Sequence, residues 1–114
     1  MTMNFKSTSD FDKEFKKLEK KFRSLQEDLK ELKKVLSVVP KRINKHFAVL
    51  HEWNGYSLLK ARFACKYLHR EPRLRIIYSY HSATETIEFI EIYFKGEKEN
   101  EDRARIQRYI KENS

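Results

Sequence analysis

The sequence predicts an α+β fold, in which an N-terminal helical hairpin packs on a small antiparallel β-sheet (a meander) and a C-terminal helix follows. Apolar residues recur at helical spacing before Pro40, and their period changes to two from Ser57 onward. The length of 114 residues, with 39% hydrophobic content, fits a single domain over residues 1–114 and is too short for a barrel enzyme.

The chain opens with a segment that predicts little structure of its own. Residues 3–7 have the length of a brief edge strand and no more. The stretch Ser7–Asp10 then supplies candidates for a helix N-cap, and Ser9 and Asp12 stand at a spacing like that of a capping box. A helix is therefore expected to begin close to residue 10.

Two helices are predicted before Pro40, over residues 10–21 and 24–36. Their apolar side chains fall at helical intervals: Phe11, Phe15, Leu18, Phe22, Leu25, Leu29, Leu32 and Leu36. One long helix is the alternative, because no Gly or Pro interrupts residues 10–38. A narrow apolar stripe of that length needs a partner, which favours the hairpin.

Pro40 ends the helical region, and residues 41–56 are expected to form a mixed basic and aromatic connection that closes on a turn at Asn54 and Gly55. From Ser57 the side chains alternate as in a strand. One predicted face carries Lys60, Arg62, Ala64 and Lys66, and the other carries Ala61, Phe63, Cys65 and Tyr67.

Two more strands and a helix complete the prediction. The expected order is a turn at residues 69–72, a strand over 74–80, a turn at 81–86 and a strand over 87–94. The last strand is apolar on both faces except at Glu88 and Glu91, which is typical of a central strand. Gly96 ends it, and Asn100 is expected to cap a helix whose apolar side is Ile106, Tyr109 and Ile110.

Positive charge is concentrated in the middle of the chain. The net charge is +8, and residues 41–75 contribute nine Lys and Arg against two Asp and Glu. A concentrated basic region suits a polyanion, since neutralising each phosphate releases counterions. The alternative is a solvated basic surface that serves solubility.

Several protein classes are excluded or disfavoured by simple counts. The single cysteine, Cys65, rules out an internal disulfide or a cysteine-based zinc cluster, and no other residues have the spacing of a metal site. No apolar run reaches the roughly 20 residues that span a bilayer, and the N-terminus has no signal-peptide core. We therefore expect a cytoplasmic protein.

The alternation of the predicted strands gathers cations on one face. If Phe63 and its neighbours face the core, Lys60, Arg62 and Lys66 share the other face, and Arg73 and Arg75 join them from the next strand. Like charges this close repel, so the face favours an anionic ligand or an internal carboxylate such as Glu91. The alternative is a solvent-facing surface with ordinary salt bridges.

These segments, in this order, resemble the RelE/ParE superfamily of bacterial type II toxin–antitoxin toxins. The resemblance covers nearly the whole chain and rests on four stretches: Phe11–Leu18 (FDKEFKKL), Lys60–Phe63 (KARF), Leu74–Tyr78 (LRIIY) and Ile90–Lys95 (IEIYFK). The basic strand followed by Leu-Arg-Ile-Ile-Tyr is its most specific part. The resemblance implies a compact sheet packed against a helical hairpin.

The resemblance also implies an activity. RelE-like members are ribosome-dependent mRNA endonucleases, and ParE-like members poison DNA gyrase. The family's basic residues on the first long strand would correspond to Lys60, Arg62 and Lys66, and its arginine on the next strand to Arg75. Arg75 suits charge stabilisation on the phosphate. Lys60 would act as a base if crowded cations depress its pKa, and would otherwise bind phosphate.

The sequence departs from the family near the C-terminal helix. RelE-like nucleases often place a Tyr or His there, whereas this chain has Lys95-Gly96-Glu97-Lys98-Glu99-Asn100, and no Tyr follows before Tyr109. Lys95, Lys98 or Tyr93 would then take that role, or the chemistry differs. The predicted catalytic set is Arg75, Lys60, Lys95 and Tyr93, with Arg62, Lys66, Arg73 and Lys98 as RNA-binding residues.

Trp53 and His51 are further RNA-binding candidates just before the basic strand. Trp53 would stack on a base, although an indole more often packs a loop onto the core. Cys65 is most simply a small buried hydrophobic residue, and the tyrosines Tyr78, Tyr80 and Tyr93 belong to the core or its edge.

Three functions are weighed: an mRNA-cleaving toxin that acts on the ribosome, a gyrase poison of the same fold, and a non-catalytic module that binds RNA or an acidic protein. The resemblance implies a cognate antitoxin, expected to cover the helical hairpin or the basic face with an acidic or amphipathic helix, or to add a strand to the sheet edge. No cofactor is indicated.

Overall fold

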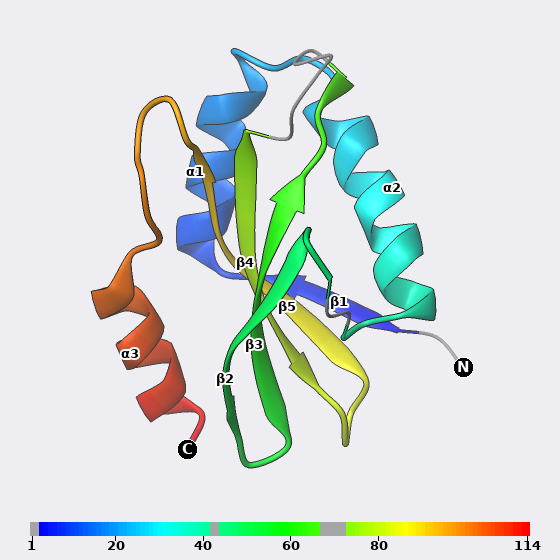
Figure 1. Cartoon of the computed structure of the whole chain (residues 1–114), viewed down its shortest axis with the longest axis vertical. Helices are drawn as coiled ribbons and strands as arrows, with labels where there is room; N and C mark the ends of the chain where they lie inside the picture. The colour runs from blue at the N-terminus through cyan, green and yellow to red at the C-terminus, as the bar shows by residue number, and fades with distance from the viewer. Residues whose placement is uncertain (1–2, 42–43, 67–72) are drawn as a thin grey trace.

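The computed structural model describes residues 3–41, 44–66 and 73–114, and its helices and strands are shown in Figure 1. The elements are β1 (Asn4–Ser7), α1 (Ser9–Glu19), α2 (Leu25–Val38), β2 (Phe47–Trp53), β3 (Tyr56–Phe63), β4 (Leu74–His81), β5 (Thr86–Phe94) and α3 (Arg103–Glu112). In the part of the chain that is described, no helix combines the length and apolar character needed to cross a bilayer.

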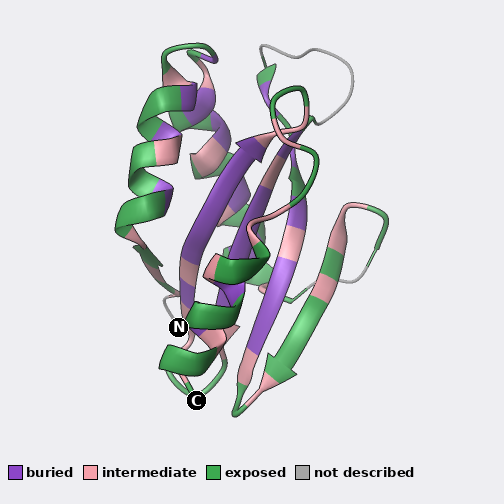
Figure 2. Cartoon of the chain, turned by 90° about the vertical axis from the view of Figure 1, so that its left-hand side faces the viewer, coloured by how far each residue is buried: buried purple, intermediate pink, exposed green. Residues whose placement is uncertain are grey.

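Five strands form one sheet in the order β1-β5-β4-β3-β2. Strands β2 to β5 are antiparallel neighbours in chain order, which confirms the predicted meander. Strand β1 pairs in parallel with β5, starting with Asn4 beside Thr86, so the short segment predicted over residues 3–7 is an edge strand. Strand β2 forms the opposite edge and is largely exposed (Figure 2).

The N-terminal helices form the predicted hairpin and cover one face of the sheet (Figure 1). The chain turns between them at residues 20–24, where Phe22 is buried and its N–H donates to the carbonyl of Leu18. Thr8 caps α1 by accepting from the N–H of Phe11. The expected capping box is absent, since Ser9 lies inside the helix and Asp12 accepts from the hydroxyl of Ser7 at 2.6 Å.

The sheet separates two hydrophobic clusters. The larger one joins the hairpin to the face of the sheet that carries Leu59, Ala61, Phe63, Leu74, Ile76, Tyr78, Ile87, Phe89 and Ile92, with Cys65 buried beside it. On the other face, α3 places Ile106 and Tyr109 against Leu58, Ile77 and Ile90. Figure 2 shows α3 in front of the buried central strands. Because α3 packs on the Leu58 end of β3, it does not cover the other end.

The segment 41–56 was expected to be a connection, and this was wrong. It contains β2, which pairs with β3 from Phe47 opposite Ala61 to Trp53 opposite Tyr56. A register shift between Val49 and His51 interrupts the period of two. An edge strand also needs no continuous apolar face, so its sequence pattern is weak.

Two other boundaries differ from the prediction. Strand β3 ends at Phe63, so Ala64, Cys65 and Lys66 lie beyond it. The cap of α3 is Asp102, whose carboxylate accepts from the N–H of Arg105, and not Asn100. The predicted positions of Tyr67 and of the turn at residues 69–72 lie outside the described residues.

Candidate functional site

Strand register brings the candidate residues into two adjacent rows on the face of the sheet opposite the hairpin. Arg62 on β3 lies beside Arg75 on β4, and Arg75 lies beside Tyr93 on β5. The next row places Lys60 opposite Ile77, and Ile77 opposite Glu91. Neighbouring positions of this kind stand about 5 Å apart, so the side chains of both rows can act on one ligand.

Arg75 is half-buried between Arg62 and Tyr93, and its Nη1 donates to the carbonyl of Leu74 at 3.1 Å. Burial lowers the pKa of Arg75, and the neighbouring charge of Arg62 lowers it further. Two guanidinium groups side by side repel each other, and an anion placed between them would relieve this repulsion. Arg62 and Arg75 are thus two members of the predicted cationic face that lie directly side by side in the structure.

Lys60 shares its charge with a carboxylate that comes from far along the chain. Its Nζ lies 2.8 Å from Oε1 of Glu101, and the hydroxyl of Tyr93 donates to the same oxygen at 3.4 Å. Both charged side chains are mostly covered, with exposed fractions of 24% for Lys60 and 14% for Glu101. We call Lys60, Arg62, Arg75, Tyr93 and Glu101 the Arg75 cluster.

The protonation of Lys60 follows from this pairing. Burial acts to lower the pKa of Lys60, but its hydrogen bond to Glu101 and the Tyr93 hydroxyl outweigh burial and raise it. For Glu101, burial acts to raise the pKa, and the bonds from Lys60 again outweigh it, so the pKa is lowered. The condition for Lys60 to act as a base, a depressed pKa, is not met. Its role as a phosphate-binding cation stays a prediction.

The remaining candidates from the segment after β5 have separate contacts. Tyr93 is 4% exposed, and burial raises its pKa against the lowering effect of Lys60. The Nζ of Lys98 donates to Glu91 and lies 5.5 Å from the centre of the Tyr93 ring. Lys95 donates to the backbone carbonyl of Glu99 at 2.6 Å, a contact within the loop. Of the three residues, Tyr93 alone belongs to the Arg75 cluster.

Glu91 is fully buried and anchors the loop that carries these residues. Its carboxylate accepts from Lys98 and, at 2.9 Å, from the N–H of Asp102, the cap residue of α3. Glu91 was predicted as one possible neutralising partner for the basic face, and in the structure it forms an ion pair with Lys98. By holding Asp102 it also fixes the neighbouring Glu101 against the sheet.

Two predicted members of the basic face lie elsewhere. Lys66 follows the end of β3 and pairs with Glu27 of α2 at 3.0 Å. The guanidinium of Arg73 stands 5.3 Å from the centre of the Phe94 ring, which packs against Phe22 of the hairpin. The cationic face is therefore narrower than alternation alone predicted, because β3 ends at Phe63, three residues before Lys66, and the Arg73 guanidinium packs on an aromatic ring.

Trp53 and His51 do not join the Arg75 cluster. Trp53 pairs with Tyr56, which is six residues from Arg62 along β3, or about 20 Å at the usual rise. Its indole N–H donates to the carbonyl of Asn113, and its ring stacks between His51 and Tyr56. The indole therefore packs within the protein, against the end of α3, which is the kind of role that the sequence analysis gave as the alternative to base stacking. The base-stacking role of Trp53 stays a prediction.

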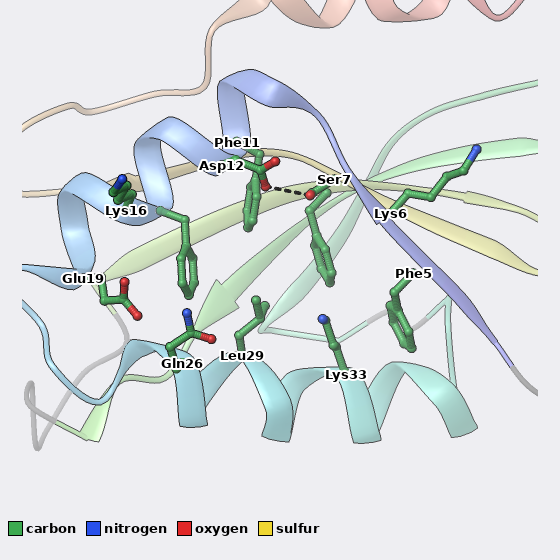
Figure 3. Close-up of a pocket in the computed structure, with 12 residues that line it drawn as sticks. Phe5, Lys6, Ser7, Phe11, Asp12, Lys16, Glu19, Gln26, Leu29 and Lys33 are labelled. Atoms are coloured by element: carbon green, nitrogen blue, oxygen red, sulfur yellow. Dashed lines mark hydrogen bonds between the residues drawn. The ribbon is translucent and has the colours of Figure 1, made fainter.

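A groove of about 430 Å³ lies on the opposite face, among β1, α1 and α2 (Figure 3). Phe5, Phe11 and Leu29 contribute its apolar wall, Lys16 of α1 lies at its lining, and the side chain of Lys33 reaches toward it from α2. It shares no residue with the Arg75 cluster. Within residues 3–41, 44–66 and 73–114, no three His, Cys, Asp or Glu side chains are grouped to hold a metal ion.

Glu101 is the member of the cluster that the sequence did not reveal. It lies in a loop, 41 residues after Lys60, and no period or motif points from one to the other. The one available signal was the run of acidic residues around the gap where the family often has Tyr or His. A carboxylate in that position could have been tested as a partner for the cationic face.

Comparison with known proteins supports the fold. No protein-family model matches the sequence, and no curated protein matches it either. A chain in the crystal structure of the archaeal RelE–RelB complex from Pyrococcus horikoshii OT3 superposes with a TM-score of 0.63, at 21% identity, over 84% of this chain and 98% of that one.

A second solved structure, the metal-bound toxin from Helicobacter pylori, superposes with a TM-score of 0.51, also at 21% identity, over 84% of this chain and 98% of that chain. Both similarities cover most of this chain and nearly all of the other. The fold of this chain is that of the RelE-like toxins.

Proposed function

We propose that this chain is the toxin of a type II toxin–antitoxin system and that it cleaves mRNA on translating ribosomes. The observation that carries the proposal is the pair Arg62 and Arg75, side by side with Lys60 and Tyr93 on a part of the sheet that α3 leaves uncovered. The fold shared with RelE, a toxin solved in complex with RelB, supports the same conclusion.

Cleavage of RNA by side chains alone would use the Arg75 cluster as follows. The 2′-oxygen bonds to the adjacent phosphorus as its proton leaves to solvent, and the bond from phosphorus to the 5′-oxygen breaks. Arg75 and Arg62 stabilise the charge that grows on the phosphoryl oxygens. Lys60 binds the same phosphate, and Tyr93, or Lys95 from outside the cluster, donates the proton that the 5′-oxygen requires.

The proposed partners follow from the same function. A toxin must be held inactive by an antitoxin, and the RelE neighbour was solved with its partner RelB. The predicted contact is an acidic or amphipathic helix over the hairpin or the basic face. Translating ribosomes and their mRNA are the proposed targets, which places the activity in the cytoplasm.

The test is induced expression in bacteria with growth and mRNA integrity as readouts. The wild type should arrest growth and leave mRNA cut within translated codons, and Arg75→Ala should abolish both effects. Arg23→Ala, which removes one exposed arginine from the turn between α1 and α2, is the matched control and should behave as the wild type. Intact mRNA in arrested cells would overturn the nuclease proposal.

Two outcomes would point to the other functions. Arrest with DNA damage and intact mRNA would indicate a gyrase poison of this fold. No arrest from a folded, abundant product, together with salt-sensitive RNA binding, would indicate a non-catalytic module.

A further inference from the structure

The Arg75 cluster already contains an anion. Oε1 of Glu101 accepts from the ammonium of Lys60 at 2.8 Å and from the hydroxyl of Tyr93 at 3.4 Å. An ammonium and a hydroxyl are also the donors that a phosphate oxygen would use. The carboxylate therefore stands where the proposed substrate has to bind.

This placement is supported by contacts on both sides of Glu101. The next residue, Asp102, donates its N–H to the buried Glu91 and accepts from Arg105 as the cap of α3. Lys98, three residues before Glu101, donates to the other carboxylate oxygen of Glu91. Glu101 is thus delivered to Lys60 by a loop that is held at two points.

We propose that Glu101 is a built-in competitor of the substrate phosphate, which neutralises Lys60 and accepts the hydrogen bond of Tyr93 in the free protein and must be displaced when RNA binds. The inference rests on the proposed function and adds a regulatory element to the same site. The Glu101 carboxylate is exchanged for a substrate phosphate at the same two donors, so no covalent bond is made or broken. Its consequence is that isolated RNA binds more weakly than the cations of the cluster would allow.

The test compares two variants that change net charge equally. Glu101→Gln keeps an acceptor oxygen but removes the negative charge, and Glu99→Gln removes a charge from an exposed position in the same loop. The probe is a fluorescent oligoribonucleotide with every 2′-hydroxyl methylated, which cannot be cleaved, and the readout is fluorescence anisotropy. Glu101→Gln should bind roughly three- to tenfold more tightly than Glu99→Gln at low salt, with a smaller difference at high salt.

A second measurement asks whether the effect passes through Lys60. Lys60→Met should weaken RNA binding more in the Glu101→Gln background than in the wild type, because Glu101 no longer occupies the ammonium. Glu101→Asp keeps the charge but draws the carboxylate back by one methylene, and it should give a smaller gain than Glu101→Gln. Thermal unfolding shows that each variant is folded, and the Asp variant decides the question if the Gln variant is not.

The outcomes separate this inference from the proposed function. If the wild type binds the oligonucleotide and Arg75→Ala abolishes binding, but Glu101→Gln equals Glu99→Gln and Glu101→Asp equals the wild type, the competitor role is wrong and the RNA site stands. If neither the wild type nor Glu101→Gln binds, the RNA site itself is wrong.

Discussion

Lys60 and Glu101 form a pair whose charges depend on each other. Both side chains are mostly withdrawn from water, where a single charge would be costly, and the hydrogen bond between them offsets that cost. The Tyr93 hydroxyl adds a second donor to Glu101. The pair therefore contributes to stability and at the same time occupies a surface that the proposed function needs.

The pair predicts how stability depends on pH. For Glu101, burial acts to raise the pKa, but the bonds from Lys60 prevail, so the pKa in the folded protein lies below 4.5. The stability that ionised Glu101 contributes is therefore lost as pH falls through this folded-state pKa. For Lys60, burial acts to lower the pKa but the bond to Glu101 prevails, so the folded pKa lies above 10.5 and its stabilisation is lost as pH rises through it.

Glu101→Gln should therefore be less stable than the wild type at pH 7, and the difference should shrink as pH falls below about 4.5. Urea unfolding at pH 7, 4.5 and 3 measures the free energy of unfolding of both proteins. A difference that stays constant across this range would mean that the Lys60–Glu101 pair does not carry the effect.

At the scale of elements, α3 connects the candidate site to the rest of the sheet. Its cap residue Asp102 is bound to Glu91 of β5, and its buried residues Ile106 and Tyr109 pack on the sheet. The hydroxyl of Tyr109 donates to Glu88 at 2.7 Å and lies 2.8 Å from the hydroxyl of Ser79, so the helix is also hydrogen-bonded to β5 and β4. The start of α3 sets where Glu101 lies.

Asp102→Ala should lower the free energy of unfolding by about 1 kcal/mol, because the N–H of Arg105 loses its capping acceptor. Asn100→Ala is the matched control: the sequence pattern names Asn100 as the cap, but the structure assigns that role to Asp102. Chemical unfolding monitored by circular dichroism compares the two variants. Equal losses, or a larger loss for Asn100→Ala, would contradict the observed cap.

At the scale of the whole molecule, Arg105 joins the last helix to the first, because it pairs closely with Glu14 and lies 3.9 Å from Asp10. Arg105 of α3 donates from Nη1 and Nη2 to the two oxygens of Glu14 of α1 at 2.9 and 2.8 Å, and it also donates to the carbonyl of Ile90. The arginine side chain is 16% exposed. This contact connects α1 and α3 beside the part of β5 that follows its pairing with β1, and it keeps α3 against the sheet.

Arg105→Lys should lower the free energy of unfolding by roughly 1–2 kcal/mol, because a single ammonium cannot hold both carboxylate oxygens in the planar arrangement of a guanidinium. Arg108→Lys, an exposed substitution on the same helix, should leave stability unchanged. Urea unfolding of the three proteins checks both statements. A loss of the same size in Arg108→Lys would show that the Glu14 contact is not responsible.

The sequence by itself determined the order of the predicted helices and strands, the hairpin, the meander and the side of the sheet on which Lys60, Arg62 and Arg75 lie. These features depend on apolar periods of 3.6 and 2, which are local and legible along the chain. The edge strand β2 was not predicted, because a bulge interrupts its period of two and an edge strand needs no continuous apolar face.

Only the tertiary structure decided which charged residues meet. Lys66 goes to Glu27 and Arg73 to Phe94, whereas Glu101 comes to Lys60 across 41 residues of sequence. Such contacts depend on where a strand ends and how a loop is held by a buried carboxylate such as Glu91, and neither leaves a periodic pattern. The cations of the candidate site are therefore visible in the sequence, and the anion that neutralises them appears only when the chain is folded.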